Sequence, residues 1–196
     1  MATYKSIAYD QPLTAGGSQV LLSTFTSDGS DASASFDSSL ITSTYNEYVF
    51  RWNIIHPETT GNWMFNGSID NGSNYNVTKT TTHFSSGQKE DGSSTGVYYM
   101  AGQDLAQGTG YVDLQHDGTG AAADECSSGF VSLFNPSSTT FVKHFSTEAS
   151  ASTAGSSSVH SLVQGYFNTT SAINNIQFKF SSGEIQAGTI KLYGVN

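Results

Sequence analysis

The sequence predicts an all-β protein: a single antiparallel β-sandwich that is jelly-roll-like and has a short N-terminal arm. About ten short segments of alternating apolar and polar residues are separated by clusters of Gly, Ser, Asn and Asp. Aromatic residues make up 12% of the chain, which argues against disorder. No segment has the apolar spacing of a long amphipathic helix, so an α/β fold is not expected.

The chain of 196 residues fits one globular domain. Within it, we expect an arm with the first strands over residues 1–35 and the β-sandwich over residues 36–196. Two strands are predicted in the arm, at Tyr4–Tyr9 and Gln19–Thr26. Residues 27–35 are small and polar, as is typical of a connection between strands.

The clearest strand is predicted at Tyr45–Ile55, where apolar residues alternate with Glu47, Arg51 and Asn53. It should end at Pro57, because proline cannot donate a hydrogen bond to a neighbouring strand. Alternation in this and later strands predicts which side chains fill the core: Phe50, Trp52, Ile54, Trp63, Phe65, Leu133, Phe167, Ile176, Phe178 and Leu192.

The middle of the chain predicts shorter elements. Residues 61–83 are interpreted as a hairpin around a turn at residues 70–73, since Asn71-Gly72 suits the positive φ angles of a tight turn. After the hairpin we expect a polar loop at 85–96, a strand at Val97–Met100, one helical turn at Gln103–Gln107, a strand at Tyr111–Gln115 and a loop at 116–125.

The last third has the most regular alternation. It predicts five strands, at Gly129–Phe134, Thr140–Ser146, Val159–Phe167, Ile173–Phe180 and Gly188–Val195. The stretch between the second and third of these strands, residues 149–158, is rich in Ser and Ala, and we expect a mobile loop there.

Charge and composition exclude several function classes. The net charge of −9 disfavours nucleic acid as a partner, because binding to phosphates needs a basic surface. No apolar run approaches the roughly 20 residues of a membrane-spanning helix, so no membrane insertion is expected. The N-terminus lacks the apolar core of a secretory signal, which predicts synthesis and folding in a cytoplasm. The lone Cys126 excludes an intrachain disulfide.

No pattern in the sequence indicates an enzyme, a bound metal or a cofactor. Cys126 follows Asp124-Glu125, and nearby carboxylates weaken a thiol as a nucleophile. The densest group of ligand types is Asp113-x-x-His116-Asp117, which we interpret as a solvated turn. Asp70-Asn71-Gly72-Ser73-Asn74 lacks the distal Glu of a calcium loop and is better explained as a hairpin turn.

Two adjacent tyrosines are the candidate contact residues. Tyr98 and Tyr99 lie in a predicted strand, where neighbouring side chains point to opposite faces. One of the two should therefore lie near the surface, where it could contact a glycan or another subunit.

Four segments of the chain, taken in order, match the motifs of a known group of proteins. The chain ends with INNIQFKFSSG at 173–183 and AGTIKLYGV at 187–195, similar to a closing A-G-T-x-x-L-Y-G-[IV] pattern. Upstream, the similar segments are YNEYVF at 45–50 followed by Pro57, GSIDNGSNY at 67–75, and FNPSSTT at 134–140 followed by Lys143. In these segments the chain resembles a group of tailed-phage structural proteins that are often described as tail-fibre or virion proteins.

The resemblance implies a place on a virion, after synthesis in the host bacterial cytoplasm. It implies a non-enzymatic, tail-associated module, such as a short fibre, a spike or a receptor-binding head. Expected partners are other virion proteins, further copies of the chain in a homo-oligomer (a trimer is favoured) and a host surface glycan or receptor. A capsid decoration or cement protein is the alternative. A glycan-binding lectin-like module or a glycan-active enzyme is the remote alternative.

Overall fold

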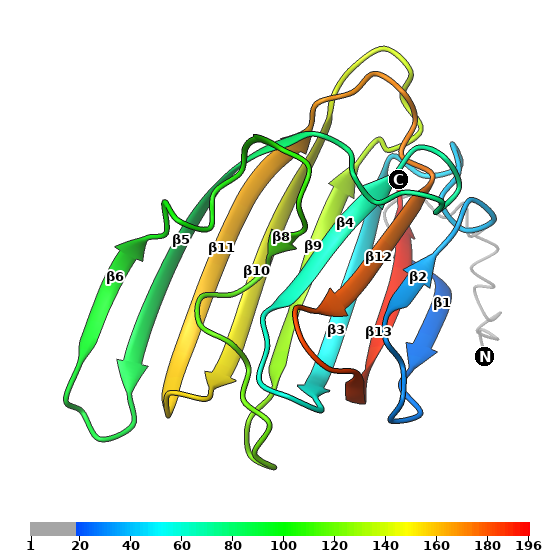
Figure 1. Cartoon of the computed structure of the whole chain (residues 1–196). Coiled ribbons are helices and arrows are strands. Elements are labelled where there is room, and N and C mark those ends of the chain that lie inside the picture. Colours follow the sequence, from blue (N-terminus) through cyan, green and yellow to red (C-terminus); the bar gives the residue numbers. More distant parts are fainter. Residues whose placement is uncertain (1–18) are drawn as a thin grey trace, which may run out of the picture.

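The protein is a sandwich of two antiparallel sheets in the computed structural model, which describes residues 19–196 (Figure 1). This confirms the predicted all-β sandwich. The larger sheet has the order β1-β13-β3-β9-β10-β11-β5-β6, with β7 beside β5, and the smaller sheet has the order β2-β12-β4-β8. No helix in these residues is long and apolar enough to span a membrane.

The strands occupy these residues. The larger sheet consists of β1 (Val20–Thr26), β13 (Ile185–Val195), β3 (Glu47–Pro57), β9 (Ser127–Phe134), β10 (Lys143–Thr153), β11 (Ser157–Phe167), β5 (Lys79–Lys89), β6 (Thr95–Tyr99) and β7 (Ala106–Gly108). The smaller sheet consists of β2 (Ala34–Phe36), β12 (Asn175–Phe180), β4 (Trp63–Ser68) and β8 (Val112–Asp113).

The core lies between the sheets and is centred on Phe178 of β12. Its ring stacks near Trp63 and Phe65 of β4, with centroid distances of 5.8 and 6.0 Å. From the larger sheet, Phe50 and Trp52 of β3 approach the same ring to 5.4 and 6.3 Å. Every predicted core residue except Ile54 is buried here.

Ile54 was predicted on the buried face, and this prediction is wrong. Its side chain is 56% exposed, whereas Ile55 is fully buried. A β-bulge between Trp52 and Ile55 shifts the alternation by one residue, and Ile54 adopts a φ of 52°. Gly188 of β13, with a φ of 117°, lies against this bulge, where a Cβ atom would collide with the Ile54 carbonyl.

The predicted hairpin at residues 61–83 is also wrong, although its turn is present. Asn71 and Gly72 have φ angles of 58° and 82°, as expected for a tight turn. The flanking strands, however, belong to different sheets: β4 pairs with β12 and β8, and β5 pairs with β11, β6 and β7. This segment therefore carries the chain from one sheet to the other.

Three predicted non-strand segments are strands in part. β5 continues through the expected loop at 85–96 as far as Lys89. β10 and β11 continue through the expected mobile loop at 149–158, because Ala149, Ala151 and Thr153 form a buried face of small side chains. The expected helical turn at Gln103–Gln107 is absent: Gln103 ends a hydrogen-bonded turn, and Ala106 and Gln107 belong to β7, which pairs with β5.

The part of the predicted arm that the structure describes is integrated into both sheets. β1 pairs with β13, and β2 pairs with β12, where Ala34 is buried. The predicted strand at Tyr4–Tyr9 lies outside the described residues.

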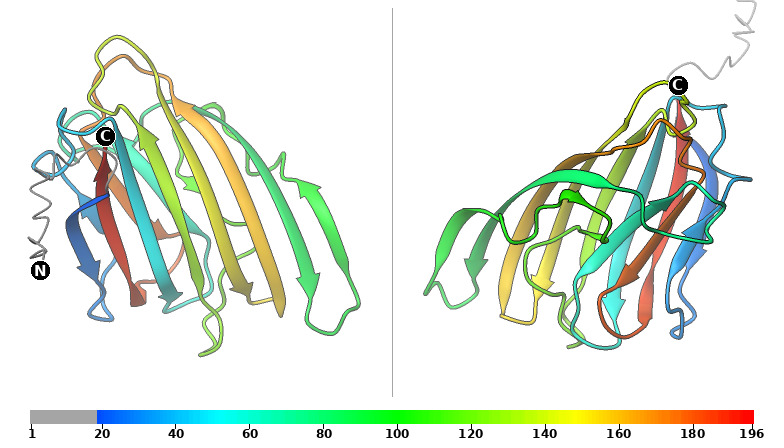
Figure 2. Two further views of the ribbon diagram at one scale, coloured as in Figure 1. Left: turned by 180° about the vertical axis from the view of Figure 1, so that it is seen from behind. Right: turned by 45° about the horizontal axis from the view of Figure 1, so that its top comes forward.

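The larger sheet extends beyond the smaller one on the side of β11, β5 and β6, which we call the wing (Figure 2). A cover segment, residues 100–126, lies over its inner face. Leu105 N donates to Thr81 Oγ1 of β5 at 2.8 Å, and His116 N donates to Ser161 Oγ of β11 at 2.9 Å. The outer face of the wing has no second sheet over it (Figure 2, left).

Candidate functional site

A row of side chains crosses the outer face of the larger sheet from β6 to β3. The strand register places neighbouring members opposite one another, and alternation directs them all outward. We call this the aromatic row: Tyr99, Phe84, Leu162, Glu148, Phe130 and Arg51. At its wing end, Tyr99, Phe84 and Leu162 are all exposed. At its inner end, the Arg51 guanidinium lies 5.8 Å from the Phe130 ring centroid.

The structure places the two candidate tyrosines at the wing end of this row. Tyr99 is 54% exposed on the outer face, with its ring 5.1 Å from that of Phe84. Its hydroxyl donates to Asp104 Oδ2, and this bond raises the pKa of Tyr99. Tyr98 is 38% exposed, and its ring lies 5.8 Å from that of His116 in the cover segment. Both are accessible because β6 is an edge strand.

Beside the aromatic row, the outer face is hollowed into two shallow grooves that meet at Ser158. The first, of about 360 Å³, spans β6, β5 and β11. The second, also of about 360 Å³, continues over β10 to the start of β9. We call them together the serine trough, and its main lining residues are Ser86, Gln88, Thr95, Val97, His160, Ser158, Ser152, Ser150, Ser128, Cys126 and Glu90. Hydroxyl groups dominate this surface.

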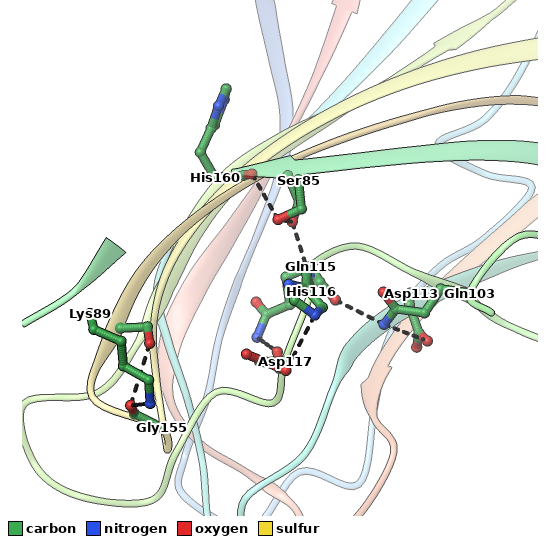
Figure 3. A network of polar contacts seen from close by, with 11 residues as sticks. Ser85, Lys89, Gln103, Asp113, Gln115, His116, Asp117, Gly155 and His160 are labelled. Atoms are coloured by element: carbon green, nitrogen blue, oxygen red, sulfur yellow. Dashed lines mark hydrogen bonds and ion pairs between the residues drawn. The ribbon is translucent and has the colours of Figure 1, made fainter. Parts of the chain in front are cut away.

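One hydrogen-bonded pair of side chains, His160 and Glu148, lies where the aromatic row borders the serine trough. His160 Nε2 is 3.1 Å from Glu148 Oε1, and each side chain is about half exposed. Ser85 of β5 pairs with Ser161, the neighbour of His160 on β11, but the Ser85 side chain lies on the opposite face of the sheet. Its hydroxyl donates to the main-chain oxygen of His160 at 3.1 Å, and the His160 ring points away from it (Figure 3). These residues therefore do not form a nucleophile–base pair.

A network of polar contacts runs through the cover segment and reaches the wing at Ser161 and Ser85 (Figure 3). Gln103 Nε2 donates to Asp113 Oδ2 at 3.3 Å, and Gln115 Nε2 donates to Asp117 O at 3.3 Å. Burial raises the pKa of Asp113. His116 Nε2 lies 3.4 Å from Asp117 Oδ1. Within residues 19–196, no three His, Cys, Asp or Glu side chains are grouped as metal ligands would be.

The carboxylate of Asp70 is hydrogen-bonded to residues in and next to the turn at residues 70–74. Asp70 accepts hydrogen bonds from the Asn74 side chain at 2.7 Å and from Ser68 Oγ at 2.6 Å. These bonds lower the pKa of Asp70 to about 2. The residues interpreted as a turn and not as a calcium loop thus form a closed turn.

Sequence reasoning missed His83, which lies on the inner face of β5. It is fully buried, and neither ring nitrogen has a hydrogen-bond partner in the described part of the chain. Burial, with a smaller contribution from the charge of His116, lowers the pKa of His83 to about 4, while Asp104 opposes this shift. The available signal was the alternation of Thr81, His83 and Ser85 with Thr82 and Phe84, which indicates a strand with a polar inner face.

Comparisons of the chain with protein-family models, with curated proteins and with solved structures gave no match. The resemblance to tailed-phage structural proteins therefore stays a prediction from sequence patterns. In the structure, the four segments that carry it fall in β3, in β4 and the turn after it, in the turn after β9, and in β12 and β13.

Proposed function

We propose that this chain is a non-enzymatic structural protein of a tailed-phage virion, and that it acts as a tail-associated module. The outer face of its wing is the contact surface in this proposal. The observation that carries the proposal is the exposed end of the aromatic row, where Tyr99, Phe84 and Leu162 lie side by side in solvent. Adjacent exposed apolar side chains on a soluble protein are typical of an interaction site.

The geometry suits binding because the surface is held by regular strands. Tyr99, Phe84 and Leu162 come from three hydrogen-bonded neighbours, so their backbone positions are set before a partner arrives. A pre-organised surface loses less conformational entropy on binding than a mobile loop would. Aromatic side chains add large contact areas with few rotatable bonds.

The chemistry of the face favours a partner that is both polar and flat, such as a host surface glycan or a receptor. Aromatic rings at one border provide apolar faces, and the hydroxyl groups of the serine trough provide donors and acceptors. In this proposal, other virion proteins occupy surfaces away from the row.

Particle composition tests the proposal directly. The chain should be present in a purified phage particle at a few to some tens of copies located at the tail, as counted by quantitative mass spectrometry and imaging. Hundreds of copies on the shell would identify a capsid decoration protein instead. Absence of the chain from the particle would overturn the proposal.

A pair of variants tests the contact surface. Replacing both Phe84 and Tyr99 by Ser should reduce host-cell binding by at least about tenfold, because the apolar end of the aromatic row is lost. The matched control is Phe141→Ser, which removes an aromatic ring that is 70% exposed in the connection before β10. Equal binding by the two proteins would show that the row is not the contact surface.

A further inference from the structure

The edge of β6 presents main-chain groups that the sheet does not use. Lys89 N donates to Ser94 O, and Met100 N donates to His83 O, both at 2.9 Å. In an antiparallel pair such bonded positions recur at every second residue, so the even-numbered residues of β6 bond to β5. Thr95, Val97 and Tyr99 therefore direct their N–H and C=O groups away from the sheet.

This edge also lacks the features that commonly prevent strands from pairing. β6 contains no charged residue and no proline, and its register with β5 shows no bulge. Val97, at its centre, is 81% exposed. The ring of Tyr98 lies over Gly96, along the strand, and leaves the edge open. By contrast β1, at the opposite end of the sheet, carries a bulge between Leu21 and Ser23.

We propose that β6 pairs antiparallel with β6 of a second copy of this chain, about a twofold axis at Val97. In that register Val97 lies opposite the partner's Val97, and Thr95 lies opposite the partner's Tyr99. Every outward-directed N–H and C=O of the three residues then exchanges a hydrogen bond with the partner. The two large sheets would continue as one.

The sequence of the edge favours a copy of itself over an unrelated strand. All three side chains lie on the outer face, and both kinds of cross-strand pair, Val with Val and Thr with Tyr, are of the types that stabilise sheets. The charge distribution also favours pairing with a second copy of the chain. The chain carries a net charge of −9, and β6, with Phe84 and Leu162 beside it, contributes no charged side chain where two acidic molecules would meet; the Asp104 carboxylate lies at its Tyr99 end.

The expected association is weak for the isolated protein. A five-residue edge buries on the order of a few hundred Å² per partner, below the roughly 800 Å² of a standard stable interface. Several copies held together on a particle would strengthen it by raising the effective concentration. The inference goes beyond the proposed function, because the edge pairs in this way whether or not the chain belongs to a virion. The trimer that the sequence resemblance favours would need a different surface.

Analytical ultracentrifugation of the full chain, from about 10 µM to about 1 mM, tests the pairing. We expect a monomer–dimer equilibrium that Val97→Lys weakens at least tenfold, since it places two like charges at the twofold axis. The matched control is Leu21→Lys, the same change at an exposed residue of the other edge strand, which should leave the equilibrium unchanged. A wild-type chain that stays monomeric throughout, or a dimer that Val97→Lys leaves intact, would overturn the proposal.

Crosslinking provides a second readout that detects even a weak dimer. In the proposed register the two Val97 Cα atoms lie about 5.5 Å apart, within the range of a disulfide. In a Cys126→Ser background, Val97→Cys should form a covalent dimer on oxidation, and Leu21→Cys should not. Equal crosslinking at both edges would mean random collision and would contradict a specific pair.

Discussion

Lys79 Nζ of β5 donates a hydrogen bond of 2.6 Å to Asn66 Oδ1 of β4, and this contact joins the two sheets inside the core. Both residues are fully buried. The ammonium also donates to Val77 O at 2.6 Å, and Asn66 Nδ2 donates to Tyr75 O at 2.6 Å. Burial lowers the pKa of Lys79 to about 7. One polar centre thus holds together the segment at which the chain changes sheets.

Replacing Asn66 by Ala should lower the free energy of unfolding by about 1–3 kcal/mol, because Lys79 and the Tyr75 carbonyl lose a buried partner. Urea denaturation of the two proteins measures the difference. Asn76→Ala is the control, since Asn76 is exposed, and it should change stability by less than about 0.5 kcal/mol. A similar loss in both variants would contradict a structural role for the buried amide.

Acid should destabilise the protein through His83. Its pKa is lowered to about 4 in the folded state, chiefly by burial, and the unfolded chain binds the proton near pH 6.5. The stability present above pH 6.5 is therefore lost progressively as the pH falls to about 4, by at most about 3 kcal/mol. Asp104, which favours the charged ring, and His116, which disfavours it, are the ionisable groups facing His83.

Denaturation at a series of pH values between 7.5 and 4.5 measures this effect. His83→Phe should flatten the dependence over that window, because the titrating group is gone. His144→Gln removes an exposed histidine of β10 and is the control, which should keep the pH dependence of the wild type. An unchanged pH dependence in His83→Phe would show that another group is responsible.

Gly129 of β9 should not tolerate a side chain. A Cβ atom there would lie 2.6 Å from Trp52 Cζ2 and 2.9 Å from the Ala149 Cα. Gly129→Ala should therefore cost about 1–3 kcal/mol through displaced core and backbone atoms. Gly102→Ala is the matched control, since nothing lies within 4 Å of its added Cβ. Thermal unfolding of both variants gives the comparison, and equal melting temperatures would contradict the packing at Gly129.

The bulge in β3 predicts opposite behaviour for two adjacent isoleucines. Ile55→Ala should cost about 2–5 kcal/mol because the side chain is fully buried. Ile54→Ala should change stability by less than about 1 kcal/mol, because Ile54 is exposed. Chemical denaturation of each variant measures both values. A larger loss of stability for Ile54→Ala than for Ile55→Ala would show that Ile54 faces inward, and would contradict the bulge.

Alternation along the chain was sufficient to locate most strands and part of the core, including the residues at its centre. Phe50, Trp52 and Phe178 were assigned to the core from their spacing, and all three are buried. The reason is local: a strand sends successive side chains to opposite faces, so a period of two marks the buried face wherever the strand is regular. Tyr98 and Tyr99 could be selected for the same reason, and both are exposed at the wing edge.

Where buried side chains are small or polar, this signal weakens. Ala149, Ala151 and Thr153 line a buried face, but a run of Ser, Ala and Thr resembles a loop. His83 escaped notice for the same reason, since Thr81 and Ser85 beside it are polar as well. Burial at these positions comes from the cover segment and the neighbouring strands, which lie far away in the sequence.

By itself, the sequence determined the class of fold, the approximate strands and the identity of several large core residues. Only the tertiary structure decided that β4 and β5 belong to different sheets, that Ile55 and not Ile54 faces inward, and that β6 is an open edge. The same Asn71-Gly72 turn serves a hairpin or a sheet crossing equally well. Which of these forms depends on the packing of distant strands, because alternation specifies the face of a strand and not its neighbour.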